Sequence, residues 1–437
     1  MKKLEGRAIL CLILAAFLVL GSCVFVVRLA LEGGQWASFY ANQHVFHDGV
    51  LSVGAVYDRN GTLLLKNDKK GQHYNEEKAI RVSTVHVTGD KGSNIATGAN
   101  VAYRSKMIGY NFVTGTKGLL FGSGRKTTLS IDANLNKVAY EALAGRDGFV
   151  SIYDWTTGEI LCMVSSPAFD PEDEDAAANA KSGAYINKAM SATFTPGSIF
   201  KLVTTAAAIE NIEDLNHWTY TCTGTYEVEG DKVTCSQQHG KVDIYSALAK
   251  SCNCAYASLT IQLGSQTMES YVEKLGLTES YDVNGIHSAK GEFLFDAAKV
   301  NLAWAGIGQY EDRLNPLSMM VYMGAIAGGG TAKTPVLIKD SHSTNVTLLS
   351  EDTASQLKDM MRNNVKENYG DSNFPGLKLR AKTGTAEVGK GRTPHSWFCG
   401  FTGDYAFIVC VENGGSGIGN AAPVANKTLQ ALVNGEK

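Results

Sequence analysis

The clearest run of hydrophobic positions lies near the N-terminus, where residues 8–27 form a stretch of 20 without a charged side chain. A helix over this run would be about 30 Å long, which is the thickness of the hydrocarbon core of a bilayer. The run therefore predicts a transmembrane anchor. Because Lys2, Lys3 and Arg7 precede it, the positive-inside rule predicts that residues 1–7 are cytoplasmic and that the rest of the chain is extracytoplasmic.

Two other interpretations of the same run are weaker. A cleaved signal peptide has a shorter apolar region, of about 7 to 15 residues, followed by a small-residue cleavage site, and this run has neither feature. A lipoprotein signal is suggested by the Leu-Gly-Ser-Cys sequence of residues 20–23, but the hydrophobic residues 24–27 argue against cleavage before Cys23. We expect the anchor to be retained.

The segment 28–127 is more polar and predicts a small module between the anchor and the main domain. Residues 53–64 alternate apolar side chains around the dipeptide Asn60-Gly61, which is a strong signal for a β-hairpin. Residues 89–124 are rich in Gly, Ser and Lys and predict loops. Because the segment has few apolar runs, we expect an open module rather than a thick domain.

The periodicity changes near residue 128, and residues 128–437 predict one larger domain. Residues 132–143 have helical spacing behind an acidic N-cap, and long helical patterns run from residue 198 to about residue 325. Strands are predicted on either side of these helices, at residues 149–153, 160–164, 377–388, 397–402 and 405–411. Strands at both ends with helices between them predict an α/β domain whose sheet gathers both ends of the segment.

Composition narrows the class of protein. The chain has 437 residues, of which 44% are hydrophobic and 19% charged, and this is enough for a large core and excludes a disordered chain. The net charge of −3, from 40 basic and 43 acidic residues, gives no electrostatic signature of nucleic-acid binding. We therefore expect a membrane-anchored globular protein that does not bind nucleic acid.

The nine cysteines are too few for a disulfide framework, and two of them lie in the anchor. Of the others, Cys222 and Cys235 could close a loop, and His239 beside them raises the question of a zinc site. Two cysteines with twelve residues between them and a single histidine lack the paired spacing of a zinc ligand set. We expect mostly buried free thiols, and we expect neither a metal nor another cofactor.

The candidate nucleophiles come from the pattern Ser-x-x-Lys, which occurs at Ser123, Ser198 and Ser355. Ser123 lies in a glycine-rich turn, and Ser355 lies in a polar helical pattern without a Ser-x-Asn before the later Lys-Thr-Gly. Ser198 follows Thr-Pro-Gly and opens an apolar helix, so Lys201 shares a helix face with it. A serine needs a base within hydrogen-bond reach, and an apolar environment favours the neutral form of a lysine. We predict Ser198 as nucleophile and Lys201 as base.

A second motif, Ser251-Cys252-Asn253, lies at a tight connection between two helical patterns. A serine hydroxyl there can relay a proton, and an asparagine amide can hold both a lysine and a substrate amide. The other Ser-x-Asn, at Ser343, lies in a polar stretch typical of a surface loop. We predict that Ser251 and Asn253 face the same cleft as Ser198.

A third motif, Lys382-Thr383-Gly384, continues to Thr385 within a predicted strand. The lysine charge and the threonine hydroxyls can bind a carboxylate, and Gly384 would let a ligand backbone approach the strand. The backbone N–H of Ser198, at a helix N-terminus, and that of Thr385 would then be two donors for an oxyanion.

Ser-x-x-Lys, Ser-x-Asn and Lys-Thr-Gly in this order are the motif set of penicillin-binding proteins and class A β-lactamases. From Ser130 onward the chain resembles the transpeptidase domain of a class B, monofunctional penicillin-binding protein. The resemblance also rests on five short segments, Thr157–Leu161, Asp170-Pro171, Pro196–Lys201, Gly306–Gln309 and Asn315–Leu317. Residues 58–61, Asp-Arg-Asn-Gly, resemble the segment that follows the anchor in that family.

The resemblance implies a mixed α/β (α+β) fold, with an antiparallel sheet and a helical subdomain, and an extracytoplasmic D,D-transpeptidase that cross-links peptidoglycan. Ser198 would attack the carbonyl of a D-Ala-D-Ala stem peptide, with Lys201 as base and with Ser251 and Asn253 as relay. The substrate carboxylate would be bound by residues 382–385, and β-lactam antibiotics would trap the serine as a stable ester. The membrane partner implied by analogy is a polytopic glycosyltransferase.

Three other functions stay open as alternatives. A D,D-carboxypeptidase differs only in using water as the acceptor, which no motif distinguishes. A β-lactamase is suggested by the Glu-x-x-Leu-Asn pattern of residues 311–315, although these residues run directly into an apolar helix, and we expect Glu311 to face solvent. A non-catalytic sensor of β-lactams or muropeptides would need a signalling segment inside the cell, where only residues 1–7 are predicted to lie.

Overall fold

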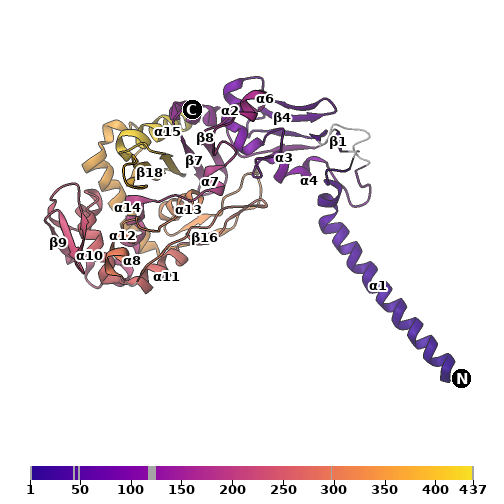
Figure 1. Ribbon diagram of the computed structural model, residues 1–437, viewed down its shortest axis with the longest axis horizontal. Coiled ribbons are helices and arrows are strands. Elements are labelled where there is room, and N and C mark those ends of the chain that lie inside the picture. Colours follow the sequence, from indigo (N-terminus) through magenta and orange to yellow (C-terminus); the bar gives the residue numbers. More distant parts are fainter. Residues whose placement is uncertain (1, 43–44, 48–49, 117–124, 297, 436–437) are drawn as a thin grey trace.

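We describe a computed structural model of the chain, covering residues 2–42, 45–47, 50–116, 125–296 and 298–435. The first helix, α1 (Lys2–Ala37), projects from the body of the molecule with the N-terminus at its far end (Figure 1). Its span from Leu4 to Ala37 contains an 18-residue window with a mean hydropathy of 3.0 and is long and apolar enough to cross a membrane. The helix extends about one and a half turns before and nearly three turns past the predicted anchor, because helix formers flank the apolar run.

The N-terminal module is built on a four-stranded sheet in the order β5-β4-β3-β6. Its elements are β1 (Phe46–His47), β2 (Val50–Leu51), β3 (Ala55–Tyr57), β4 (Leu63–Asp68), β5 (Gly71–Tyr74), β6 (Lys126–Thr128) and the helices α2 (Lys78–Thr88), α3 (Ala99–Ala102) and α4 (Arg104–Met107). The predicted hairpin is present as the antiparallel pair β3–β4. The prediction of loops over residues 89–124 was wrong for α3 and α4, because a short apolar stretch there is buried against the module.

The main domain contains a five-stranded antiparallel sheet that gathers strands from both ends of the segment. The order is β17 (Arg380–Ala386), β18 (His395–Thr402), β19 (Tyr405–Val411), β7 (Gly148–Asp154) and β8 (Ile160–Ser166). The predicted sheet and the α/β class are confirmed. The strand predicted at 377–388 is shorter, since Lys378 has a positive φ of 45° and the ladder with β18 begins at Arg380.

Side chains of the sheet alternate between two hydrophobic layers. On one face, residues such as Val150 and Ile152 pack with α5 (Ala133–Leu143) and α15 (Ala422–Gly435). On the other face, residues such as Phe149 and Trp397 belong to the layer that contains α13 (Pro316–Ala327). All twelve residues of α13 are buried, which makes this apolar helix the centre of the domain.

The helical side of the domain carries the remaining helices. They are α6 (Glu174–Ala178), α7 (Lys188–Ser191), α8 (Lys201–Asn211), α9 (Ile244–Ala249), α10 (Asn253–Leu263), α11 (Ser265–Lys274), α12 (Lys299–Ala305) and α14 (Glu351–Asn364). The prediction of helices from residue 198 to 325 was wrong for the stretch between α8 and α9. This stretch forms two small hairpin-like sheets, because β-branched and aromatic residues alternate with polar ones and Gly230, at φ +88°, makes a tight turn.

These irregular strands are β9 (Thr219–Cys222), β10 (Thr225–Val228), β11 (Asp231–Thr234) and β12 (Gly240–Asp243). Smaller two-stranded ladders join β13 (Asp282–Val283) to β14 (Ile286–His287) and β15 (Thr331–Lys333) to β16 (Asn345–Thr347). The β9–β12 region packs beside α10 at the end of the domain that lies far from α1 (Figure 1).

One buried carboxylate joins the N-terminal module to the main domain. Asp58 is fully buried, and its Oδ1 accepts the backbone N–H groups of Asn60 at 2.9 Å and Thr62 at 2.7 Å. Its Oδ2 accepts the N–H of Ala133, at the start of α5, at 3.1 Å. The same side chain therefore closes the β3–β4 turn and holds that turn on the first helix of the main domain.

We predict that Asp58→Ala lowers the free energy of unfolding of the full chain by about 3 kcal/mol, because three backbone donors lose a charged acceptor. Urea unfolding of the detergent-solubilised chain, followed by tryptophan fluorescence, measures the change. Asp68→Ala is the matched control, since this half-buried carboxylate accepts the N–H of exposed Lys70, and its loss should cost about 0.5 kcal/mol. Equal effects of the two variants would contradict the prediction.

Candidate active site

The candidate nucleophile lies in a tight turn that leads into α8. Residues Gly197–Phe200 form one turn of 3₁₀ helix, and Gly197 has a φ of +58°. A Cβ at this position would lie 2.6 Å from the Thr385 carbonyl oxygen, so only glycine fits without displacing β17. The Gly197 N–H also donates to the Gly308 carbonyl at 2.7 Å, which fixes the turn from its other side.

Lys201 begins α8 and points at the nucleophile. Its Nζ lies 3.1 Å from the Ser198 Oγ, as the i, i+3 spacing predicts, and the lysine side chain is completely buried. The same Nζ donates to the Ser251 carbonyl and to the Asn253 Oδ1, both at 2.7 Å. A neutral amine has two N–H donors, and these two acceptors use both, so its lone pair is left for a hydroxyl at 3.1 Å.

The environment of Lys201 favours that neutral form. Burial lowers its pKa from 10.5 to about 8, because the charged ammonium loses its hydration in the protein interior. The ring of Tyr256 lies beneath the amine, with the Nζ 5.5 Å from the ring centre. A lysine with this pKa exchanges protons near neutral pH.

The Ser251 loop supplies the second hydroxyl. Ser251 connects α9 to α10 with a φ of +51°, a conformation that costs a non-glycine residue about 1 kcal/mol and turns its side chain toward both lysines. Its Oγ lies 3.1 Å from the Nζ of Lys201 and 3.1 Å from the Nζ of Lys382. Asn253 is anchored from outside the loop, because its Nδ2 donates to the Thr234 carbonyl at 2.9 Å.

Lys382 is buried rather than free in the cavity. Besides the contact with Ser251, its Nζ donates to the Thr383 carbonyl at 2.8 Å. Its pKa is held well below 10.5 by burial and by the nearby charge of Lys201. The Ser251 hydroxyl thus lies between two amines that disfavour each other's charge, and a proton can pass from one to the other through it.

The edge of the central sheet forms one wall of the site. The Thr383 N–H donates to the Tyr369 hydroxyl at 3.0 Å and not to β18. The backbone N–H of Thr383 therefore points away from β18, toward the edge of the sheet. By the alternation of an antiparallel ladder, the Thr385 N–H faces the same free edge. The edge strand therefore presents a backbone donor toward the nucleophile turn.

Gly384 lies where the nucleophile turn approaches β17. A Cβ there would lie 3.0 Å from the Ile199 Cγ2 and 3.1 Å from the Pro196 carbonyl oxygen. The absence of a side chain therefore lets the turn lie against the strand, and the approach of a ligand to this glycine stays a prediction.

Four of the motif residues, Ser198, Ser251, Asn253 and Thr385, border one cavity of about 420 Å³, and buried Lys201 and Lys382 lie behind this lining. It is lined by Ser198, Thr234, Cys235, Ser236, Lys250, Ser251, Asn253, Trp304, Ile307, Gln309, Thr385 and Glu387. The sequence analysis did not assign Trp304, Gln309 or Glu387 to the site. The Gly-Ile-Gly-Gln segment, which carries the family resemblance, could have indicated Gln309. Trp304 lies on α12 and Glu387 directly follows β17, and no motif marks either residue.

The structure separates the remaining sequence candidates from this cavity. Ser355 is exposed on α14, and the Ser343 hydroxyl donates to the Thr334 carbonyl at 2.6 Å in a surface hairpin. Ser123 lies outside the described residues. Glu311 is exposed and does not line the cavity, as predicted from the apolar helix that follows it.

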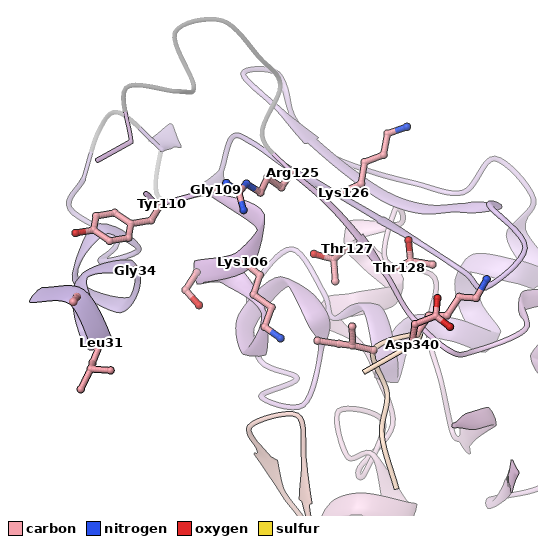
Figure 2. A pocket seen from close by; sticks show the side chains of 14 residues that line it. Leu31, Gly34, Lys106, Gly109, Tyr110, Arg125, Lys126, Thr127, Thr128 and Asp340 are labelled. Carbon is pink, nitrogen blue, oxygen red and sulfur yellow. The ribbon is translucent and has the colours of Figure 1, made fainter. Parts of the chain in front are cut away.

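A second cavity of about 740 Å³ lies at the base of the anchor helix (Figure 2). It is lined by the end of α1, including Leu31 and Gly34, and by basic residues of the module such as Lys106, Arg125 and Lys126 (Figure 2). None of the three motifs contributes a residue to it. It is therefore a feature of the junction between anchor and body, separate from the candidate active site.

One group of side chains has the composition of a metal site. Cys222, Cys235, His239 and Cys252 direct one ligand atom each to a common point, with all four atoms within 4.8 Å of one another. The sequence analysis found the first three and missed Cys252, because it counted that residue only as the middle of the second motif.

Comparison with known proteins shows what this arrangement is similar to. The model of the penicillin-binding protein transpeptidase domain family matches residues 148–430. Among curated proteins, a peptidoglycan D,D-transpeptidase of Mycobacterium tuberculosis, PbpA, is 28% identical in an alignment of length 336 that covers 66% of this chain and 67% of that protein. The stage V sporulation protein D of Bacillus subtilis is 28% identical in an alignment of length 269 that covers 56% of this chain and 41% of that protein.

Solved structures show the same fold. Penicillin-binding protein A of M. tuberculosis in a penicillin G acyl-enzyme complex superposes with a TM-score of 0.75 at 23% identity, over 87% of this chain and 99% of that one. The D,D-transpeptidase domain of a peptidoglycan glycosyltransferase from Eggerthella lenta gives 0.76 at 24% identity, over 88% and 98% of the two chains.

Proposed function

This chain belongs to the penicillin-binding protein transpeptidase family, and on that premise we propose that it is a membrane-anchored peptidoglycan D,D-transpeptidase with Ser198 as its nucleophile. The observation that carries the proposal is the unbroken chain of contacts Ser198–Lys201–Ser251–Lys382, in which each polar pair is separated by 3.1 Å. Three motifs that are 53 and 131 residues apart in sequence meet there, with the nucleophile at a cavity wall.

In the acylation step, the neutral Lys201 amine accepts the Ser198 hydroxyl proton as the Oγ bonds to the carbonyl carbon between the two D-alanines. The carbonyl oxygen gains negative charge and is held by the N–H groups of Ser198 and Thr385. As the tetrahedral adduct collapses, the Ser251 hydroxyl gives a proton to the departing D-Ala nitrogen. Ser251 regains its proton from the lysines, and an ester on Ser198 remains.

Deacylation repeats these steps with a new nucleophile. The amine of a neighbouring stem peptide attacks the ester carbon and gives up a proton toward the lysine pair, and the Ser198 Oγ leaves with a proton from Lys201. Exposed Glu387, at the cavity, supports an amine acceptor, since its carboxylate attracts a cation to this wall. The product is a cross-link between two stem peptides.

Binding of the substrate carboxylate is assigned to residues 382–385. Thr385 lines the cavity, and the Thr383 hydroxyl lies 3.1 Å from the Tyr369 hydroxyl; both threonine hydroxyls can donate to an anion. Buried Lys382 orders Ser251 through the contact with its hydroxyl, while Gly384 admits the nucleophile turn. β-Lactams present the same carboxylate next to a strained amide and would acylate the same serine.

The location of the reaction follows from α1. We propose that residues 1–7 are cytoplasmic and residues 8–27 span the membrane, with the module of residues 28–127 and the transpeptidase domain of residues 128–437 outside the cell membrane. The proposed partners are D-Ala-D-Ala stem peptides and a polytopic glycosyltransferase that supplies glycan strands in the same membrane.

We predict that a fluorescent penicillin labels the full chain covalently and that Ser198→Ala abolishes the label, because the Ser198 Oγ lies at the cavity wall, 3.1 Å from the Lys201 amine that would take its proton. Gel fluorescence after denaturation measures the label, and peptide mapping locates it. Ser355→Ala, which changes the exposed Ser-x-x-Lys of α14, should label like the parent chain. Label that survives in Ser198→Ala would refute the assignment of the nucleophile.

Acylation should rise with pH up to about pH 8 and level off above it, because the reactive form of Lys201 is the deprotonated one and its pKa is about 8. Below that value, the neutral fraction and the rate grow nearly tenfold for each pH unit. Lys201→Ala should lose about 10²-fold or more in rate and lose this pH dependence. Stopped-flow acylation with a chromogenic β-lactam checks both, and a flat profile in the parent chain would contradict the role of the lysine.

The exposed position of Glu311 predicts that the enzyme does not hydrolyse its penicillin ester rapidly. The ester should persist for many minutes in the parent chain and in Glu311→Ala alike, because no carboxylate of residues 311–315 positions a water in the cavity. Mass spectrometry of the adduct over time measures its lifetime. Turnover within seconds that stops in Glu311→Ala would support a β-lactamase instead.

A further inference from the structure

The Cys222, Cys235, His239 and Cys252 group is built like a closed zinc site, and we propose that it binds one structural Zn²⁺ that braces the Ser251 loop. Three of the distances between its ligand atoms are given by direct contacts. The sulfurs of Cys222 and Cys235 are 3.7 Å apart, those of Cys235 and Cys252 are 3.7 Å apart, and the Cys222 sulfur lies 3.6 Å from the His239 Nδ1.

These distances are those of a zinc tetrahedron. With Zn–S bonds of about 2.3 Å and a Zn–N bond of about 2.0 Å, tetrahedral geometry places two sulfurs about 3.8 Å apart and a sulfur and a nitrogen about 3.5 Å apart. A disulfide between two of the cysteines would need sulfurs about 2.0 Å apart, and it would leave the third sulfur and the histidine without a bonding partner. The closeness of all four ligand atoms therefore favours a bound metal over a disulfide.

The surroundings of the group also suit a thiolate-metal centre. Cys222 and Cys252 are buried, at 2% and 0% exposure, and Cys235 and His239 are half-buried. The Cys254 N–H donates to the Cys235 sulfur at 3.3 Å, which stabilises a thiolate from outside the ligand set. Three thiol protons leave to solvent when Zn²⁺ binds, so the completed site carries a net charge of −1.

The four ligands come from four separate segments of the chain. Cys222 ends β9, Cys235 follows β11, His239 precedes β12, and Cys252 lies in the connection between α9 and α10. One ion would thus tie the small sheets of the 219–243 region to the loop that carries the second catalytic motif. Four protein ligands leave no open position, so the metal would be structural and would take no part in acyl transfer.

The consequence for catalysis is positional. Cys252 lies between Ser251, whose φ is +51°, and Asn253, whose Oδ1 accepts from Lys201. A metal bond at the central residue resists relaxation of the strained serine and keeps both flanking side chains on the lysine. Without the ion, the loop can rotate these two groups away while Ser198 and Lys201 stay in place on α8.

The first test is metal content. The full chain, purified in detergent under reducing conditions, is incubated with Zn²⁺, desalted and analysed by inductively coupled plasma mass spectrometry, and it should hold about one Zn²⁺ per chain. The double variant Cys222→Ala/Cys235→Ala should hold less than about a tenth of that amount. Cys254→Ala is the matched control, since it removes an adjacent thiol outside the ligand group and should retain the ion. Zinc-free parent chain, or equal zinc in both variants, would overturn the proposal.

Cobalt substitution tests the geometry without a variant that has to fold. Co²⁺ added to the metal-free parent chain should produce a thiolate-to-cobalt charge-transfer band and the intense visible bands of a tetrahedral ion, and Zn²⁺ should remove them. A weak octahedral spectrum would overturn the proposal. A third measurement is alkylation of chain isolated directly from membranes, after chelation and denaturation and without a reductant. It should modify Cys222, Cys235 and Cys252. A disulfide among these three residues would also overturn the proposal.

The last arm links the ion to the loop. Removing zinc with a chelator should slow acylation by a fluorescent penicillin about 10-fold or more, and adding back Zn²⁺ but not Mg²⁺ should restore the rate. Cys254→Ala should respond to the chelator as the parent chain does. An unchanged rate in chain shown to be metal-free would refute the bracing role, and because metal content is measured separately, this outcome is distinct from a failure of Ser198 as the nucleophile.

Discussion

The burial of a single amine is the constraint on which the catalytic arrangement depends. Lys201 has no exposed surface, and an ammonium in that position would carry a large desolvation penalty. Burial lowers the pKa of Lys201 to about 8, so the neutral amine is accessible near neutral pH. The Ser251 carbonyl and the Asn253 Oδ1 each lie 2.7 Å from the Lys201 Nζ and accept its hydrogen bonds. The Ser251 loop must therefore lie against α8, and the positive φ of Ser251 is what that placement costs.

Close backbone approach forms the other half of the site. The nucleophile turn fits between β17 and the Gly308 loop only because Gly197 has no side chain, and Gly384 makes the matching space on the strand. An edge strand usually presents unpaired donors that risk aggregation. Here the edge of β17 faces the turn, so the Thr385 N–H can serve as a binding donor, and the sheet supplies a rigid frame for it.

The cysteine group and the lysine amine act on the same short loop from opposite ends. Asn253 is held by Thr234 on one side and by Lys201 on the other, and Cys235, the next residue after Thr234, lines the same cavity. The 219–243 region thus supports the active site, because it holds Asn253 in place and lines the same cavity. Because this region lies close to the reaction, an ion at the proposed zinc site would influence the rate of acyl transfer without an open coordination position.

Features that depend on neighbours in sequence could be predicted from the sequence alone. The apolar anchor, the hairpin at Asn60-Gly61, the central strands and the pairing of Ser198 with Lys201 each follow from residues within one or two turns of each other, where spacing fixes geometry. The α/β class followed as well, because strands flank the helices along the chain. The catalytic roles of the motif residues stay predictions, although the structure brings them together.

Only the tertiary structure decided which distant residues meet. It showed that Lys382 is buried against Ser251, 131 residues away, that Gly384 faces the nucleophile turn, and that Cys252 completes a ligand set with residues before β12. It also showed strands packed against α10 in the 219–243 region, where helix had been predicted. Spacing along a chain determines which side chains share a face, but a contact across many residues depends on how whole elements pack, and no local pattern records that.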